Sequence, residues 1–183
     1  MAELLWCWRH ARVAQAHCRC IGRTDLTLAA RQAKRLAHRI RAHARRHKLA
    51  REVWVSPLAR CRASAQWLRR WGWAVHVDAR LLEVDFGLWE GRAWADITWP
   101  EVQAWQHDLL HHAPGGGETL AKVALRAHAF AAEGQGARIV LTHGGWINAL
   151  REVHASTPSV DAARWPAPPA PGSCTAWHAR HPT

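Results

Sequence analysis

Short apolar runs alternate along this chain with longer segments in which apolar residues recur every three or four positions. The short runs are expected to form strands over residues 3–8, 53–55, 75–77 and 138–142, with an edge strand over 173–179. The periodic segments are expected to form helices that carry the apolar stripes of residues 29–44, 58–68 and 120–130. A further helix is expected after Pro100, with Val102, Trp105 and Leu109 on one side, and another through Ile147 and Leu150. This alternation predicts an α/β fold, a three-layer α/β/α sandwich with a mostly parallel central sheet.

The length of the chain, 183 residues of which 49% are hydrophobic, suits one well-filled core and is too short for two ordinary domains. We therefore expect one domain over residues 1–183, with a proline-rich segment at 166–171 before the edge strand. No apolar run approaches the ~20 residues that cross a bilayer, and the first residues lack the pattern of a signal peptide. These observations predict a cytoplasmic protein with no membrane partner.

The five cysteines are odd in number and irregularly placed, which argues against a disulfide framework and suits a reducing compartment. The nearest approach to a metal-binding pattern is His17-Cys18-x-Cys20. A zinc site usually needs a second closely spaced pair of ligands, and the other three cysteines each stand alone. The sequence therefore predicts idle thiols, no metal site and no cofactor.

The formal net charge of +11 raises the question of a nucleic-acid partner, so the location of the charge matters. Nine Lys and Arg residues and no acidic residue lie from Arg31 to Arg51, which leaves +2 for the rest of the chain. The same stretch has the apolar stripe of an amphipathic helix. We interpret it as a helix with a solvated basic face in preference to an RNA-binding stripe, and expect no nucleic-acid partner.

Two histidines stand where expected strands end. His10 follows the first strand, and His143 follows the strand over 138–142. In parallel α/β sheets, ligands bind beyond the carboxyl ends of the strands. We therefore expect the two histidines to share one site, although they lie far apart in the sequence.

Several motifs add polar residues to these histidines. They are Trp8-Arg9-His10, Gly22-Arg23-Thr24-Asp25-Leu26, Ser56-Pro57-Leu58-Ala59-Arg60, the acidic loop from Leu82 to Gly91, Gly116-Gly117-Glu118-Thr119 and Thr142-His143-Gly144-Gly145. In order and spacing they resemble the motifs of the histidine phosphatase (phosphoglycerate-mutase-like) superfamily, particularly its α-ribazole-phosphatase-like branch. The resemblance extends from Leu5 to about Trp177.

The chemistry of phosphoryl transfer explains these residue types. A neutral imidazole can attack phosphorus and divide one difficult displacement into two easier ones, which is the role we assign to His10. Guanidinium groups suit the charged phosphoryl oxygens, so Arg9 and Arg60 are expected to hold them, and His143 can donate a further hydrogen bond. One carboxyl group can protonate the leaving oxygen and later deprotonate water. By resemblance, that residue is Glu83.

The resemblance also implies a wider set of phosphate-binding residues. The full predicted set is Arg9, His10, Gln15, Arg23, Thr24, Arg60, His143 and Gly144. Two positions depart from the family pattern, which usually has glycine at Ala11 and often asparagine at Ala16. Gln15 is a candidate substitute for that asparagine. Glu90 and Glu118 are alternative carboxylates for the acid role, but the resemblance assigns both to loop structure.

The expected activity is hydrolysis of a small phosphorylated metabolite through a phosphohistidine, without a metal ion, because two arginines and two histidines supply the positive charge. Mutases of this family carry insertions that cover the site, and this chain lacks room for them. Resemblance to the branch implies α-ribazole 5′-phosphate, a substrate of cobalamin nucleotide-loop assembly. Phe86, Trp89 and Trp94 are candidates for an aromatic wall against a heterocyclic base, although core packing explains Trp89 equally well.

Two alternatives stay open on the sequence. One is phosphoryl transfer of the phosphoglycerate-mutase type. The other is a polyanion- or RNA-binding protein on the same fold with weakened catalysis, which the basic stretch, Ala11 and Ala16 favour. The dependence on salt concentration distinguishes this second alternative from a phosphatase. Polyanion binding weakens steeply as counterions compete, whereas turnover of a small phosphomonoester depends on salt less steeply.

Overall fold

The computed structural model describes residues 4–134, 136–154 and 156–178. Within these ranges one sheet contains β1 (Leu4–Arg9), β2 (Glu52–Val55), β3 (Ala74–Val77), β4 (Ala137–Thr142) and β5 (Cys174–His178). The α-helices are α1 (Ala30–Arg46), α2 (Ala59–Arg70), α3 (Trp99–His107), α4 (Leu120–Ala132) and α5 (Gly144–Glu152). The predicted alternation of strands and helices is confirmed. Positions 3 and 179, predicted as ends of the first and last strands of the chain, lie outside the described residues.

The strand order places the ends of β1 and β4 next to each other. The order is β3-β2-β4-β1-β5, in which β5 runs antiparallel to β1 at one edge and the other pairs are parallel. The register of β1 and β4 sets Arg9 opposite Thr142. The residues that follow them, His10 and His143, therefore leave the same edge of the sheet together.

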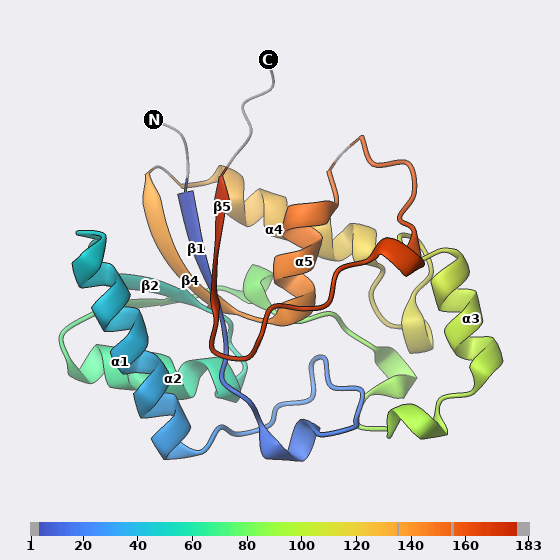
Figure 1. Ribbon diagram of the computed structural model, residues 1–183, viewed down its shortest axis with the longest axis horizontal. Coiled ribbons are helices and arrows are strands. Elements are labelled where there is room, and N and C mark those ends of the chain that lie inside the picture. Colours follow the sequence, from blue (N-terminus) through green and yellow to red (C-terminus); the bar gives the residue numbers. More distant parts are fainter. Residues whose placement is uncertain (1–3, 135, 155, 179–183) are drawn as a thin grey trace.

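Helices cover both faces of the sheet (Figure 1), as the predicted three-layer sandwich requires. Side chains alternate along β1, so that Leu5 and Cys7 pack with α4 and α5, whereas Trp8 packs with α1 and α2. The helix α3 lies apart from these layers, beyond the end of the sheet (Figure 1). None of the described helices combines the length and the apolar character that crossing a lipid bilayer requires.

Two predicted helix boundaries need correction. The basic stretch is helical only to Arg46, because Lys48 has a φ of 53° in the left-handed region and the chain reverses there. The helix predicted after Pro100 begins at Trp99 and includes the proline, since Thr98 and Glu101 form a capping box. It ends at His107, two residues before Leu109.

Candidate active site

A cavity of about 430 Å³ opens beyond the carboxyl ends of β1 and β4. Its lining includes Arg9 and His10 from the end of β1, Arg60 from α2, Glu83 from the loop after β3, and Gly144 from the start of α5. His143 is fully buried next to it, with its ring centroid 5.1 Å from that of His10. The structure therefore brings together all five residues that the sequence assigned to catalysis.

The ring of His10 has one nitrogen fixed by the backbone. Its Nδ1 lies 2.7 Å from the carbonyl oxygen of Ala11. Because a carbonyl oxygen can only accept, Nδ1 carries the proton and Nε2 keeps a free lone pair. Burial lowers the pKa of His10 to about 3, and the charge of Arg60 adds to this effect. The ring is therefore neutral at physiological pH, as a nucleophilic imidazole must be.

Both ring nitrogens of His143 are engaged inside the protein. Arg60 donates from Nε to Nδ1 of His143 at 3.3 Å, so that the proton of the neutral ring lies on Nε2, which contacts the Ser56 hydroxyl at 2.7 Å. Burial, followed by the charge of Arg60, holds the pKa of His143 well below its usual value. The hydrogen bond from His143 to phosphate stays a prediction. Ser56, which the sequence analysis named only as part of a motif, holds the orientation of the His143 ring.

The guanidinium of Arg60 joins α2 to the loop around residue 23. Its two terminal nitrogens donate to the carbonyl oxygens of Gly22 at 2.5 Å and Thr24 at 2.8 Å. Each terminal nitrogen carries two hydrogens, so one N–H on each is left for a phosphoryl oxygen. The side chain is fully buried, which fixes its orientation.

Arg9 reaches the cavity from the last position of β1. Its Nη1 donates to the carbonyl oxygen of Pro169 at 2.6 Å, in the proline-rich segment. Its buried Nε has no hydrogen-bond partner among the described residues. Burial lowers the pKa of Arg9, and the Glu83 carboxylate opposes this change. An unpaired buried N–H at a cavity indicates a place for an anion.

The carboxylate of Glu83 lies against the N-terminus of α5. It accepts from the amides of Val84 at 3.1 Å, Gly145 at 3.2 Å and Trp146 at 3.1 Å, and the residue is 8% exposed. A Cβ at Gly145 would lie 2.6 Å from Oε1 of Glu83, so a larger residue there would displace the carboxylate from this position. Within the described chain the amide of Gly144 has no acceptor, and such an amide at the start of a helix is suited to bind an anion.

The alternative carboxylate Glu90 is occupied by the loop around Gly22. It accepts hydrogen bonds from the amides of Gly22, Arg23, Thr24 and Phe86 and from the Thr24 hydroxyl. Burial alone would raise the pKa of Glu90, but the bonds from Thr24 and Arg23 outweigh it and lower the pKa. Glu90 therefore acts as a fixed acceptor that shapes the loop.

Glu118 is occupied in the same way by arginines. It pairs with Arg126 at 2.9 Å and with Arg23 at 3.2 Å. Burial tends to raise the pKa of Glu118, and the bond and charge of Arg126 reverse the shift. Arg126 also donates to the carbonyl oxygens of Arg80, Leu82 and Glu83, so this pair holds the backbone that carries Glu83.

Four predicted phosphate-binding residues do not line the cavity, and one of them, His143, is buried next to it. The side chain of Gln15 is exposed, Arg23 pairs with Glu118, and the Thr24 hydroxyl donates to Glu90. Their contact with phosphate stays a prediction. Conversely, Arg19 lines the cavity, and no motif indicated it.

Aromatic side chains form one wall of the cavity. Phe86 packs edge-on against Trp94 and Trp105, with ring centroids 6.1 Å and 6.0 Å away, and all three line the cavity. Trp89 is instead buried, and its Nε1 donates to Glu101 at 3.2 Å. Core packing is therefore the correct interpretation of Trp89, and Trp105 takes its place in the wall.

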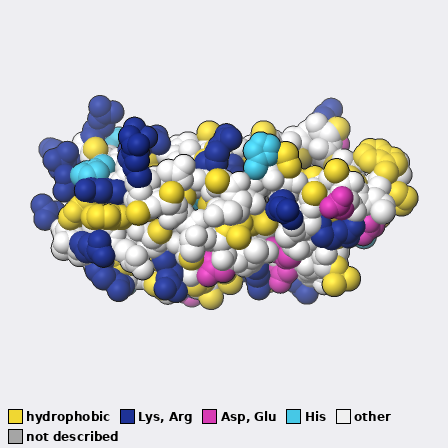
Figure 2. Space-filling view, turned by 90° about the horizontal axis from the view of Figure 1, so that it is seen from below, with side chains coloured by type: hydrophobic (Ala, Val, Ile, Leu, Met, Phe, Trp, Pro, Cys, Tyr) yellow, Lys and Arg dark blue, Asp and Glu magenta, His cyan; other side chains and the backbone are white. Residues whose placement is uncertain are grey.

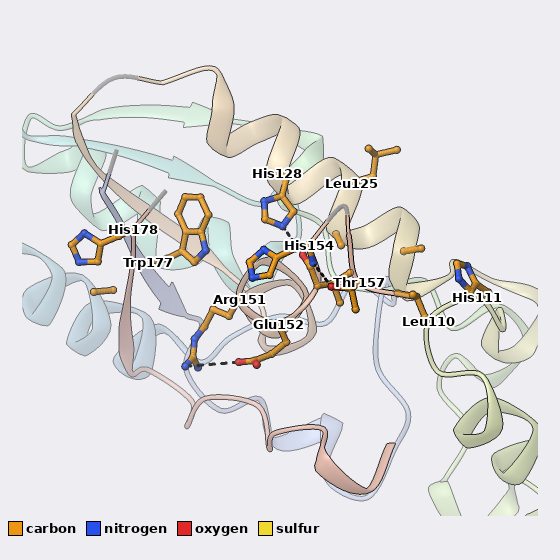
Figure 3. A pocket seen from close by; sticks show the side chains of 14 residues that line it. Leu110, His111, Leu125, His128, Arg151, Glu152, His154, Thr157, Trp177 and His178 are labelled. Carbon is orange, nitrogen blue, oxygen red and sulfur yellow. Dashed lines mark hydrogen bonds and ion pairs between the residues drawn. The ribbon is translucent and has the colours of Figure 1, made fainter. Parts of the chain in front are cut away.

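A larger hollow, of about 910 Å³, lies near the opposite end of β1, beside Trp177 of β5 (Figure 3). None of the predicted catalytic or phosphate-binding residues lines it. Two of its polar groups are engaged with neighbours: His128 contacts the carbonyl oxygen of Val153 at 2.7 Å, and Arg151 lies 3.9 Å from Glu152. The predicted site residues therefore gather at the smaller cavity and not at this hollow.

The described residues contain no group of three or more His, Cys, Asp or Glu side chains that could hold a metal ion. In the run considered for metal binding, Nδ1 of His17 lies 2.7 Å from Sγ of Cys18, and Cys20 is buried apart from both in a cluster with Trp89.

Comparisons with known proteins agree with this geometry. No curated protein matches the sequence. The native structure of mycobacterial glucosyl-3-phosphoglycerate phosphatase is 28% identical, with a TM-score of 0.78 over 96% of this chain and 90% of that chain. The same protein in complex with VO3 has 28% sequence identity and a TM-score of 0.77, over 96% of this chain and 92% of that chain. Phosphoglycerate mutase from Thermus thermophilus has 25% sequence identity and a TM-score of 0.69, over 94% of this chain and 91% of that chain.

The sequence profile of one family matches residues 5–182, nearly the whole chain. That profile and the site geometry agree, and the protein belongs to the histidine phosphatase superfamily (branch 1).

Proposed function

We propose that this protein is a cytoplasmic phosphomonoester hydrolase that acts through a phosphohistidine on His10. One observation carries the proposal: a neutral His10 with a free Nε2 lies at a cavity that also holds Arg9, Arg60 and the unbonded amide of Gly144. A nucleophile and three donors for phosphoryl oxygens are thus in one place. The five cysteines are free, which supports a reducing compartment.

In the first step Nε2 of His10 attacks phosphorus, the bond from phosphorus to the substrate oxygen breaks, and Glu83 gives its proton to that oxygen. The Nδ1–H bond to Ala11 persists and stabilises the positive charge of the phosphorylated ring. In the second step water attacks phosphorus, Glu83 takes the proton of the water, and the N–P bond breaks. Phosphate leaves, and His10 and Glu83 return to their starting states.

The lining supports a substrate with a flat apolar group. Phe86, Trp94 and Trp105 form a wall on which a heterocyclic base can stack. α-Ribazole 5′-phosphate combines such a base with a phosphorylated ribose, and we propose it as the substrate, in cobalamin nucleotide-loop assembly. Glucosyl-3-phosphoglycerate, named for the mycobacterial relative, is the matched competitor, because it carries a sugar and a carboxylate instead of a base.

A panel of phosphomonoesters tests the function. It includes α-ribazole 5′-phosphate, nucleoside monophosphates, sugar phosphates, glucosyl-3-phosphoglycerate and the phosphoglycerates. We expect phosphate release, lost in His10→Ala, with the highest kcat/KM for esters that carry a base. Interconversion of phosphoglycerates without phosphate release would show that the protein is a mutase and not a phosphatase.

The aromatic wall has its own control on the same helix. Trp105→Ala should lower kcat/KM for esters with a base and leave glycerol phosphate unaffected, since only a base stacks on the wall. Trp99→Ala should change neither, because Trp99 is 62% exposed on α3 and does not line the cavity. An equal loss for both ester types in Trp105→Ala would show that Trp105 only supports the fold.

A further inference from the structure

The surface of α1 and α2 is basic without compensating acidic groups. Twelve Lys and Arg residues between positions 31 and 70 are exposed or half-buried. Between residues 26 and 77 the only acidic residue is Glu52, and its carboxylate contacts His76 at 2.6 Å. Across the described residues, none of the twelve cations forms an ion pair. Figure 2 shows the dark blue side chains gathered at the end of the molecule where α1 and α2 lie.

A groove of about 380 Å³ lies within this basic surface. Its charged and aromatic lining comprises Arg41, Arg45, Lys48, Arg51, Trp71 and Trp73. The guanidinium of Arg41 lies 4.6 Å from the ring centroid of Trp71, and its buried Nε has no hydrogen-bond partner among the described residues. The groove shares no lining residue with the catalytic cavity.

The aromatic character continues along α2 from the groove. The ring of Trp67 lies 6.1 Å from that of Trp71, and Lys34 and Arg70 each place their charge 4.9 Å from the Trp67 ring. Cations and indoles therefore alternate over the surface. The 17 residues of α1 extend over roughly 26 Å, which exceeds the reach of one nucleotide and suits a chain of phosphates.

We propose that this surface binds single-stranded nucleic acid, with phosphates on the cations of α1 and α2 and a base against Trp71 in the groove. Unpaired cations attract phosphates, and indoles stack with bases of any sequence. A membrane is the poorer match, because the exposed large apolar side chains all lie outside residues 26–76 and leave the surface without an anchor. The sequence alone favoured a solvated basic face. The groove and the indoles beside the cations, which only the structure shows, are the reason for proposing a bound nucleic acid instead.

Fluorescence anisotropy of the full chain with a labelled single-stranded RNA of about 12 nucleotides tests the proposal. The double variant Arg45→Gln/Lys48→Gln should weaken binding about tenfold and make the slope of log K against log salt less steep by about 1.4, which is two phosphate contacts. The control Lys122→Gln/Arg164→Gln removes the same charge from exposed positions elsewhere and should bind as the wild type does.

A second comparison tests the base. Trp71→Leu should weaken RNA binding about tenfold but leave binding of inorganic polyphosphate unchanged, since polyphosphate has nothing to stack. Because Trp71 is partly packed in the core, Trp71→Phe, which keeps a smaller ring in the same place, serves if Trp71→Leu fails to fold, and it should weaken RNA binding without changing polyphosphate binding.

Three results would overturn the proposal. The first is no RNA binding at about 0.1 M salt, and the second is equal weakening in the control and the groove variants. The third is preference for inorganic polyphosphate or for phosphatidylserine vesicles over RNA, which would identify a general polyanion or a membrane as the ligand. Loss of RNA binding would leave the proposed hydrolase intact, because the groove and the catalytic cavity have no residue in common.

Discussion

Nδ1 of His10 is hydrogen-bonded to the carbonyl oxygen of Ala11 at 2.7 Å. The family pattern usually has glycine at this position, yet the contact uses only the backbone, so the methyl group of Ala11 leaves it intact. This hydrogen bond places the proton of the His10 ring on Nδ1, and burial keeps the ring neutral, so that Nε2 carries no proton. A neutral, oriented nucleophile is therefore compatible with this departure from the family pattern.

The low pKa of His10 predicts how stability depends on pH. In the unfolded chain the ring has its usual pKa of about 6.5, and in the folded protein about 3. Between these values the unfolded state binds a proton that the folded state does not, so the free energy of unfolding falls as pH drops from 6.5 towards 3. His10→Gln should make this slope less steep by up to about 1.4 kcal/mol per pH unit in urea titrations. An unchanged slope would mean that the folded protein lets the ring protonate.

Arg60 should not tolerate lysine. An ammonium group cannot reach the carbonyl oxygens of Gly22 and Thr24, the ring of His143 and a phosphoryl oxygen together. We expect Arg60→Lys to lower kcat/KM for para-nitrophenyl phosphate by about 10²-fold or more. Arg62→Lys, exposed on the same helix, is the control and should match the wild type. Similar activity of both variants would remove Arg60 from the phosphate site.

The acid role of Glu83 should show in the dependence on the leaving group. A general acid contributes ~10²–10⁴-fold to rate, and much less when the leaving group departs as a stable anion. In Glu83→Gln, formation of the phosphoenzyme should therefore slow greatly with an alkyl phosphate and little with para-nitrophenyl phosphate, in pre-steady-state measurements. Dephosphorylation should slow with either substrate.

Glu90→Gln is the matched control for this comparison, because Glu90 only holds the loop around Gly22 and Thr24. Any slowing in Glu90→Gln should be the same for both substrates. The same pattern in Glu83→Gln would show that Glu83, which bonds three backbone amides, only shapes the pocket.

The sequence predicted the parts of the site that follow regular elements. Apolar runs located β1 and β4, and parallel pairing brought His10 and His143 together. The loop contacts could not be predicted in this way, because they depend on tertiary packing. The carbonyl oxygen of Pro169 that receives Arg9 comes from a segment without periodicity. Helical periodicity located α3 but could not show that Trp105 faces the cavity.

Hydrolysis should not depend on a metal ion, since Arg9 and Arg60 provide the positive charge that a metal supplies in other phosphatases. Extensive dialysis against a chelator should leave kcat and KM unchanged. Loss of activity that an added divalent metal restores would contradict this expectation, and His17, Cys18 and Cys20 would be the first ligands to test.

The covalent intermediate is the most direct test of the account. Rapid mixing with radiolabelled substrate, followed by an alkaline detergent quench, should trap protein-bound phosphate that is stable to alkali and lost in acid. With labelled para-nitrophenyl phosphate, Glu83→Gln should accumulate it, because formation is little slowed with this substrate while dephosphorylation is slow, and peptide mapping should place the label on His10. The account is contradicted by label that persists in His10→Ala, by label on another residue such as His143, or by wild-type hydrolysis that proceeds without any labelled protein.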